Sequence, residues 1–225
     1  MFRSYTLAGL ALLILYGSAA GSTLAILPTP GSSTICCGVY TDATALFPLP
    51  TPDGTLFTQL ISGSETLTFS SPFMRLSVPA TWASWSSPPQ SETSTPAVAW
   101  SNGQDGATLT LSAAVAIFGF ELEPDDLTGA HTYTVSFLSG GESLGSIMLP
   151  VSGNAGALLF AGEVTGSTDP NLIDTVTISG DTDFAVANLR YGNVDAVPEP
   201  ASLLLILAGS VFIAGRRRAA RGMGK

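Results

Sequence analysis

Apolar and polar residues alternate with a period of two through most of the chain between residues 55 and 192. In the run 65–69, Leu67 and Phe69 lie on one side and the threonines on the other, as in a half-buried antiparallel strand. The same alternation recurs at 107–111, 132–137 and 175–178. Turn sequences such as Asn102-Gly103 and Gly140-Gly141 separate the runs. About eight to eleven such strands predict an all-β fold, an antiparallel β-sandwich of jelly-roll-like form.

Two stretches lack this alternation. The sandwich domain is predicted to span residues 55–193. The segment 21–54 before it contains five prolines, which predicts a Pro-rich lead-in or an edge of the sandwich. Residues 86–96 are also irregular and predict a long surface loop. No amphipathic helix is predicted outside the two ends of the chain.

The N-terminal end has the layout of a secretory signal peptide. Arg3 precedes an apolar segment from Leu7 to Tyr16, and small residues follow up to Ala20. We therefore expect residues 1–20 to be a signal peptide that brings the chain to the secretion translocon. An uncleaved N-terminal anchor is the alternative, and both place the remainder outside the cytoplasm.

The C-terminal end predicts one short membrane span. Residues 201–215 are apolar, and a helix of that length spans roughly 22 Å, somewhat less than the ~30 Å of a bilayer core. Arg216, Arg217 and Arg218 follow within the basic tail 216–225, which the positive-inside rule places in the cytoplasm. This pattern predicts a transmembrane helix at 201–215.

Pro198, Glu199 and Pro200 stand directly before this span. The order of tripeptide, apolar span and arginine cluster over 194–225 resembles the PEP-CTERM sorting signal. The resemblance implies recognition by an exosortase, an intermediate anchored in the inner membrane, and a final place at the cell surface or in the extracellular matrix. It also implies an association with exopolysaccharide. A plain membrane anchor that nothing processes is the alternative.

Four segments of the sandwich region carry a second resemblance. They are 82–85 (WASW), 118–124 (FGFELEP), 153–160 (GNAGALLF) and 183–192 (DFAVANLRYG). These segments are similar to a bacterial surface β-sandwich domain often found ahead of PEP-CTERM tails. That family has no assigned molecular activity, so the resemblance implies a fold and no reaction.

The charge of the segment between Gly21 and Val197 excludes one class of partner. Arg75 and Arg190 are its only bases, against sixteen acids, so its formal charge is −14. Such a surface repels the phosphate backbone, and we expect no nucleic acid partner.

Carboxylates near two predicted turns are candidate metal ligands. They are Glu121, Glu123, Asp125, Asp126, Asp181 and Asp183. Carboxylate oxygens suit calcium, although their spacing is not that of an EF-hand, and a solvated acidic loop is the alternative. With one histidine and two adjacent cysteines, Cys36 and Cys37, the chain has no zinc-site spacing.

Three tryptophans, Trp82, Trp85 and Trp100, are a candidate platform for stacking against sugar rings. The alternative is that they belong to the core, as large aromatic residues often do. Exposed tryptophans beside acidic loops would favour a carbohydrate- or calcium-dependent binding module. Buried tryptophans would favour a structural or adhesive protein.

Catalytic chemistry has little support in the sequence. Residues 141–145 (GESLG) match the nucleophile elbow of serine hydrolases, but they occupy a predicted hairpin turn and not a strand-to-helix turn. His131, the only histidine, precedes Ser143, whereas that hydrolase fold places its histidine last. We therefore expect no enzymatic activity and no cofactor.

Overall fold

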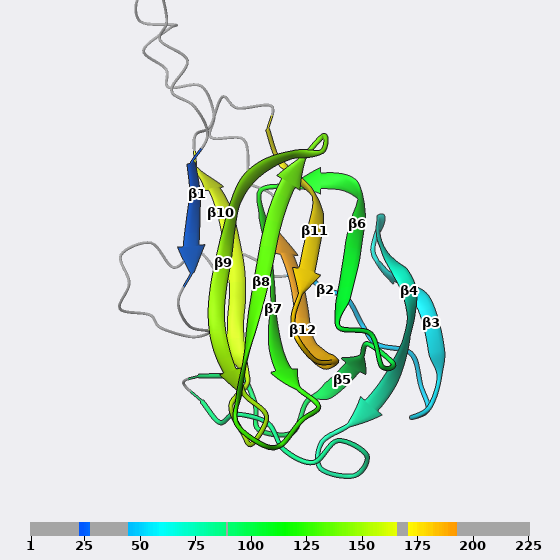
Figure 1. The fold of residues 1–225 in the computed structure, drawn as a ribbon. Helices are drawn as coiled ribbons and strands as arrows, with labels where there is room; N and C mark the ends of the chain where they lie inside the picture. The colour runs from blue at the N-terminus through cyan, green and yellow to red at the C-terminus, as the bar shows by residue number, and fades with distance from the viewer. Residues whose placement is uncertain (1–22, 28–44, 89, 166–170, 193–225) are drawn as a thin grey trace, which may run out of the picture.

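The computed structural model describes residues 23–27, 45–88, 90–165 and 171–192. These residues form an all-β domain of twelve antiparallel strands, without helix (Figure 1). Consequently, this part of the chain contains no helix that could span a membrane. The predicted signal peptide, the predicted span at 201–215, the sorting tripeptide 198–200, the arginines 216–218 and the cysteines 36 and 37 all lie outside the described residues.

The strand bounds are as follows. β1 is Thr23–Leu27, β2 Ala45–Leu46, β3 Leu56–Ser62, β4 Glu65–Ser77, β5 Ala97–Trp100 and β6 Gly106–Val115. β7 is Ile117–Pro124, β8 Ala130–Ser139, β9 Glu142–Ser152, β10 Leu158–Thr165, β11 Ile173–Ser179 and β12 Phe184–Gly192. β1 and β2 come from the segment 21–54, so part of the predicted lead-in belongs to the sheet.

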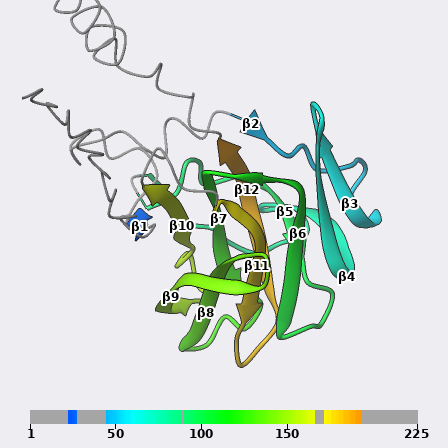
Figure 2. The ribbon, with the colours of Figure 1, turned by 90° about the horizontal axis from the view of Figure 1, so that it is seen from above.

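The strands form two layers that share β4. One layer has the order β1-β10-β7-β12-β5, and the other has the order β6-β11-β8-β9. The first half of β4 pairs with β6 through Leu67–Phe69, and its last four residues pair with β5. β4 therefore crosses from one layer to the other, and Figures 1 and 2 show the two layers facing each other. The prediction of an antiparallel β-sandwich is confirmed.

The core fills the space between the layers, and the alternation of the sequence determines which residues enter it. β7 contributes Phe118 and Phe120, β8 contributes Tyr133 and Phe137, and all four side chains are 0% exposed. Aromatic pairs cross this core; Tyr133, for example, meets the Phe184 ring edge-on at 5.6 Å. Burial of these large side chains is the main stabilising contribution.

Two predicted turns adopt left-handed backbone for a clear stereochemical reason, and the first of them is a hairpin connection. Gly140 and Gly141, between β8 and β9, have φ values of 57° and 87°. Asn102 and Gly103, between β5 and β6, have φ values of 56° and 81°. Glycine and asparagine tolerate this left-handed region better than other residues, and tight hairpin turns require it.

Candidate functional site: an acidic strand face covered by tryptophans

The strand β7 is buried on both of its faces, as all eight of its residues are inaccessible. Phe118, Phe120 and Leu122 point into the core between the layers. Glu121 and Glu123 alternate with them and therefore lie on the outer face of the layer, yet both are 0% exposed. Another segment of the chain must therefore cover the outer face of β7.

That cover is the connection between β4 and β5, residues 78–96, which we call the strap. Its residues Trp82 and Trp85 are 6% and 4% exposed, and they pack in one cluster with Ala157, Ala185 and Ala187. Ala187 is the register partner of Glu121 on β12, and Ala185 is that of Glu123. Small alanine side chains beside the glutamates leave room for the indole rings.

Each of the three tryptophans donates its indole N–H to one acidic side chain. Trp85 Nε1 lies 2.8 Å from Glu121 Oε2, and Trp82 Nε1 lies 3.0 Å from Glu123 Oε2. Trp100, on β5, donates to Asp183 Oδ2 at 3.0 Å. The candidate metal ligands and the candidate sugar platform therefore contact each other.

Further donors complete the environment of the two glutamates. Glu123 Oε1 accepts the Ser84 hydroxyl at 3.3 Å and the Gly156 amide at 3.2 Å. Glu121 Oε1 accepts the backbone amide of Glu92 at 2.7 Å. The Asn188 side chain also lowers the pKa of Glu121, from a position on β12 where φ is 52° and the pairing with β7 shifts register. These donors satisfy carboxylates that are otherwise removed from water.

Burial dominates the electrostatics of both glutamates. Desolvation raises the pKa of Glu123 to about 7, even though the donors Trp82, Gly156 and Ser84 oppose the shift. Desolvation likewise raises the pKa of Glu121 against the hydrogen bond from Trp85. Both groups thus hold protons more strongly than an exposed glutamate does.

Each of the two arginines of the sandwich forms an ion pair with an acidic residue in a connecting segment. Arg190 of β12 forms a two-pronged ion pair with Glu92 of the strap. Arg75 of β4 pairs with Asp53, which also accepts hydrogen bonds from Ser77 and Thr81 at 2.9 Å each. Both bases are therefore committed to carboxylates within the fold.

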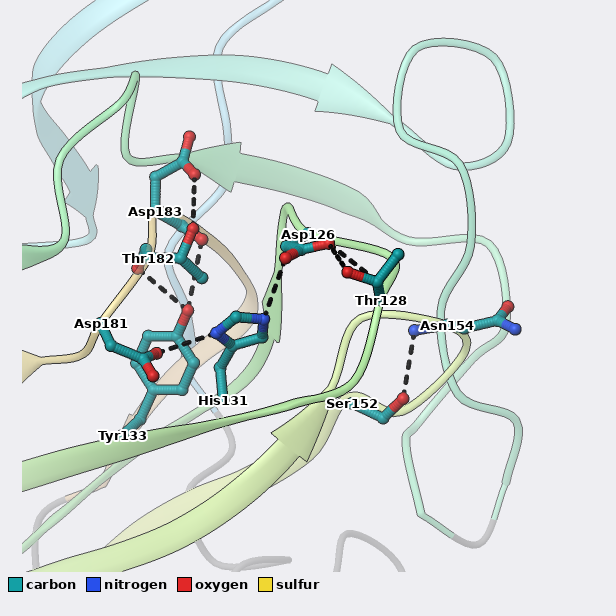
Figure 3. A network of polar contacts seen from close by, with 9 residues as sticks. All are labelled: Asp126, Thr128, His131, Tyr133, Ser152, Asn154, Asp181, Thr182 and Asp183. Atoms are coloured by element: carbon teal, nitrogen blue, oxygen red, sulfur yellow. Dashed lines mark hydrogen bonds and ion pairs between the residues drawn. The ribbon is translucent and has the colours of Figure 1, made fainter.

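A second polar network lies at one end of the sandwich, where the β7–β8 and β11–β12 loops meet (Figure 3). His131 is held between two aspartates, with Nδ1 2.9 Å from Asp181 and Nε2 3.3 Å from Asp126. Burial lowers the pKa of His131, but the hydrogen bond and charge of Asp181 outweigh it, so that the pKa is raised. Thr128 donates to Asp126 from its side chain and backbone and lowers the pKa of that carboxyl.

Asp125 and Asp183 belong to the same end of the molecule. Desolvation and the neighbouring charge of Asp183, to which Asp125 also hydrogen-bonds, raise the pKa of Asp125. The backbone supports this proximity, because the Asp125 amide donates to the Asp183 carbonyl at 3.0 Å. The Tyr133 hydroxyl donates to the carbonyls of Thr182 and Asp183 and closes the network against the core.

The six candidate metal ligands are thus divided between two environments. Glu121 and Glu123 are interior acceptors under the strap, and the four aspartates occupy the end of the sandwich. Among the described residues, no group of three or more His, Cys, Asp or Glu side chains is arranged to hold a metal ion. The alternative of a solvated acidic loop is wrong for the two glutamates, because the strap buries them.

The prediction of a sugar-stacking platform is wrong for Trp82 and Trp85. Such a platform needs exposed ring faces, and these two rings are buried. Residues 86–96 of the strap, predicted as a long surface loop, are partly interior, since Ser86 and Ser91 are buried with the two rings. Trp100 is half-buried and engaged with Asp183.

Ser143 and His131 lie at opposite ends of the β8–β9 hairpin. Ser143 is the register partner of Leu138, seven residues along β8 from His131. At about 3.4 Å per residue this separation is roughly 24 Å, too far for a nucleophile and its base. The match at residues 141–145 is therefore a coincidence of turn glycines.

Sequence reasoning missed Ser84, Glu92, Asn188 and Arg190 as parts of this site. A signal was available, because the four segments that carry the sandwich resemblance (82–85, 118–124, 153–160 and 183–192) all contribute to the strap contacts. Arg190, moreover, is one of only two bases in the sandwich. Their convergence depends on a loop folding back over the sheet, which periodicity does not describe.

Comparison with known proteins bears on the C-terminal end. Residues 196–218 match the PEP-CTERM protein-sorting motif, and the match includes Pro198, Glu199 and Pro200. The chain carries a PEP-CTERM sorting motif. This motif implies an exported protein that an exosortase recognises, so the resemblance seen in the sequence is confirmed.

Beyond the PEP-CTERM motif, the comparisons are weak. The fold has a TM-score of 0.29 and 16% identity to the crystal structure of the enzymatically active domain of bacteriophage CBA120 tailspike protein 4. That match covers 58% of this chain and only 19% of the tailspike chain. No curated protein shows significant sequence similarity to the chain.

Proposed function

We propose that this exported protein is a structural or adhesive component of the cell envelope or the extracellular matrix, and that its sandwich has no enzymatic activity. The observation that supports this role best is the inward orientation of the tryptophans. All three indole N–H groups are engaged by carboxylates of the same domain. The side chains best suited to bind sugar rings or calcium are largely engaged with each other.

The rest of the sandwich is consistent with a stable module for display. The segment between Gly21 and Val197, which includes the sandwich, has a formal charge of −14 that keeps copies soluble during export, and the core of the sandwich is continuous through both layers. After cleavage of the signal peptide and sorting by the exosortase, the chain would reach the cell surface. There it would associate with exopolysaccharide through the whole exterior of the domain and not through a single site. The rival role is a carbohydrate- or calcium-dependent binding module.

Deletion of the gene in the native host tests the proposal. We expect the matrix to lose cohesion, measured as the shear needed to disperse cell aggregates, and wild-type protein to restore it. A variant with Glu199→Ala should accumulate in the membrane fraction and fail to restore cohesion. Unchanged cohesion after deletion would overturn the proposal.

A binding assay separates the rival. Full-length protein is tested against purified host exopolysaccharide with calcium and with a chelator. Saturable binding that is lost on chelation would favour the binding module, and the variant Asp125→Asn would then locate it. Weak binding that calcium does not change is the result expected here.

A further inference from the structure

The strap is attached to the outer face of β7 through hydrogen bonds that end on two buried carboxylates. Trp82 and Ser84 reach Glu123, and Trp85 and the Glu92 amide reach Glu121. Further anchors are the ion pair between Glu92 and Arg190 and the Ser86 hydroxyl, which contacts the Ala155 and Ala157 carbonyl oxygens at 3.0 and 2.8 Å. Opening the strap would therefore expose both glutamates to water.

Glu123 is buried among neutral partners. Its hydrogen-bond donors are an indole, a hydroxyl and backbone amides. A carboxyl group removed from water without a cation favours its neutral form, and the same group in water is ionised at neutral pH. The closed strap and the open strap consequently bind different numbers of protons.

We propose that the strap is a conformational switch that takes up a proton on Glu123 when it closes over β7 and loosens as its surroundings become alkaline. Opening uncovers the rings of Trp82 and Trp85 and the alanines beneath them. This switch is separate from the structural or adhesive role proposed above. It depends on the arrangement of the strap over the outer face of β7.

The hydroxyl of Ser84 allows the protonated state to be satisfied. A carboxyl that gains a proton becomes a donor at one oxygen and needs an acceptor. The Ser84 oxygen lies 3.3 Å from Glu123 Oε1, and a hydroxyl can accept as well as donate. Trp82 contacts the other oxygen, Oε2, so its hydrogen bond persists in both states.

Charged groups around Glu123 do not reverse its preference for the neutral form. Next to Glu123 along β7 is Glu121, which also holds its proton more strongly because it is buried. On the strap, the Glu92 carboxylate raises the pKa of Glu121, and Arg190 of β12 is paired with Glu92. Asp183 of β12 is engaged with Trp100, and the backbone from Gly156 to Ala157 contributes amide and carbonyl groups.

The direction of the pH effect follows from the sign of the shift. Burial raises the pKa of Glu123 to about 7 from an ordinary value near 4.5. Between those two values the closed form holds a proton that the open form has lost, so the closed form is favoured at the acidic end and this advantage is lost as the pH rises through 7. From pH 5.5 to 8.5 the ratio of closed to open strap should fall by about thirtyfold.

Hydrogen exchange of the full-length chain in detergent measures this ratio. Protection of the peptide covering the strap is corrected for the intrinsic exchange rate at each pH, and the β11 peptide serves as the reference for global opening. We expect strap protection to fall about thirtyfold between pH 5.5 and 8.5 while β11 protection holds. In Glu123→Gln the fall should disappear, because the side chain no longer titrates.

The matched control is Glu142→Gln, which neutralises an exposed glutamate of the β8–β9 hairpin and should leave the wild-type profile unchanged. A second variant, Trp82→Phe, keeps an aromatic ring and removes one donor to the ionised carboxylate, so the pH at which protection falls should move upward. Wild-type protection that is independent of pH would overturn the switch. An equal fall in Glu123→Gln would overturn the assignment to Glu123.

Discussion

The two faces of β7 are equally buried, but different interactions bury them. The inner face presents Phe118, Phe120 and Leu122 to the facing layer, where close packing of apolar side chains is sufficient. The outer face presents Glu121 and Glu123, which stay buried only because donors on the strap and on neighbouring strands satisfy them. The inner face depends on shape, and the outer face depends on hydrogen bonds and on the state of protonation.

The difference has a consequence for function. An apolar core responds little to its chemical surroundings, because none of its groups titrates near neutral pH. A buried carboxylate layer responds to pH, because its charged form is disfavoured by burial. In an exported protein, the outer face of β7 is therefore sensitive to the pH of the medium.

The largest expected effect comes from truncating the inner face. Phe120→Ala leaves a cavity between the layers, and we expect a loss of about 3–5 kcal/mol in the free energy of unfolding. Because no titrating group is involved, the loss should be the same at pH 5.5 and 8.5 in urea denaturation. The control Met148→Ala, at a side chain that is 67% exposed, should change stability by less than about 0.5 kcal/mol. A loss that varies with pH would contradict the division between the faces.

Removing one donor from the outer face should have a smaller effect. Trp85→Phe keeps most of the ring but leaves the buried carboxylate of Glu121 without its indole partner, at a loss of about 1–3 kcal/mol in unfolding free energy. Trp100→Phe is the matched variant, and its loss should be about 1 kcal/mol or less, because Asp183 is only half-buried. Equal losses at the two sites would show that burial of the acceptor does not matter here.

Breaking the ion pair of the strap should have a local effect. Arg190→Gln leaves Glu92 without its partner and should reduce unfolding free energy by about 1 kcal/mol, since both side chains retain some contact with water. The matched variant Arg75→Gln breaks the pair with Asp53 and should have a similar global effect. Arg190→Gln should lower hydrogen-exchange protection of the strap around Glu92, whereas Arg75→Gln should affect the strap only near Thr81, which donates to Asp53. Equal protection around Glu92 in both variants would contradict the anchoring role of Arg190.

The smallest effect on stability is expected at the end of the sandwich. Asp181→Asn removes the charge that raises the pKa of His131, so that pKa should fall, as followed by NMR titration of the imidazole. In the wild type the raised pKa stabilises the fold at pH values below about 6.5, and this contribution is lost as the pH rises through the folded pKa. The change in unfolding free energy should stay below about 0.5 kcal/mol, because Asp181 is exposed. An unchanged pKa would contradict the contact.

Prediction from the sequence was most accurate where structure is local. The alternation around Leu67 and Phe69 and the glycine pair at 140–141 identified strands and turns, since side-chain direction in a strand and left-handed backbone at a turn depend on neighbouring residues. The same alternation placed Glu121 and Glu123 on one face of β7. It did not reveal that this face is covered, and so both were interpreted as candidate metal ligands or solvated acids.

The sequence by itself determined the all-β fold, the acidity of the sandwich and the sorting motif at residues 196–218, because periodicity, charge and short motifs are properties of the chain read in order. Only the tertiary structure decided the roles of the tryptophans and glutamates. Trp85 and Glu121 are thirty-six residues apart, and their contact exists because the strap folds back across β7 and β12. Burial of a polar group is settled by such long-range packing, which is also what gives Glu123 its altered affinity for protons.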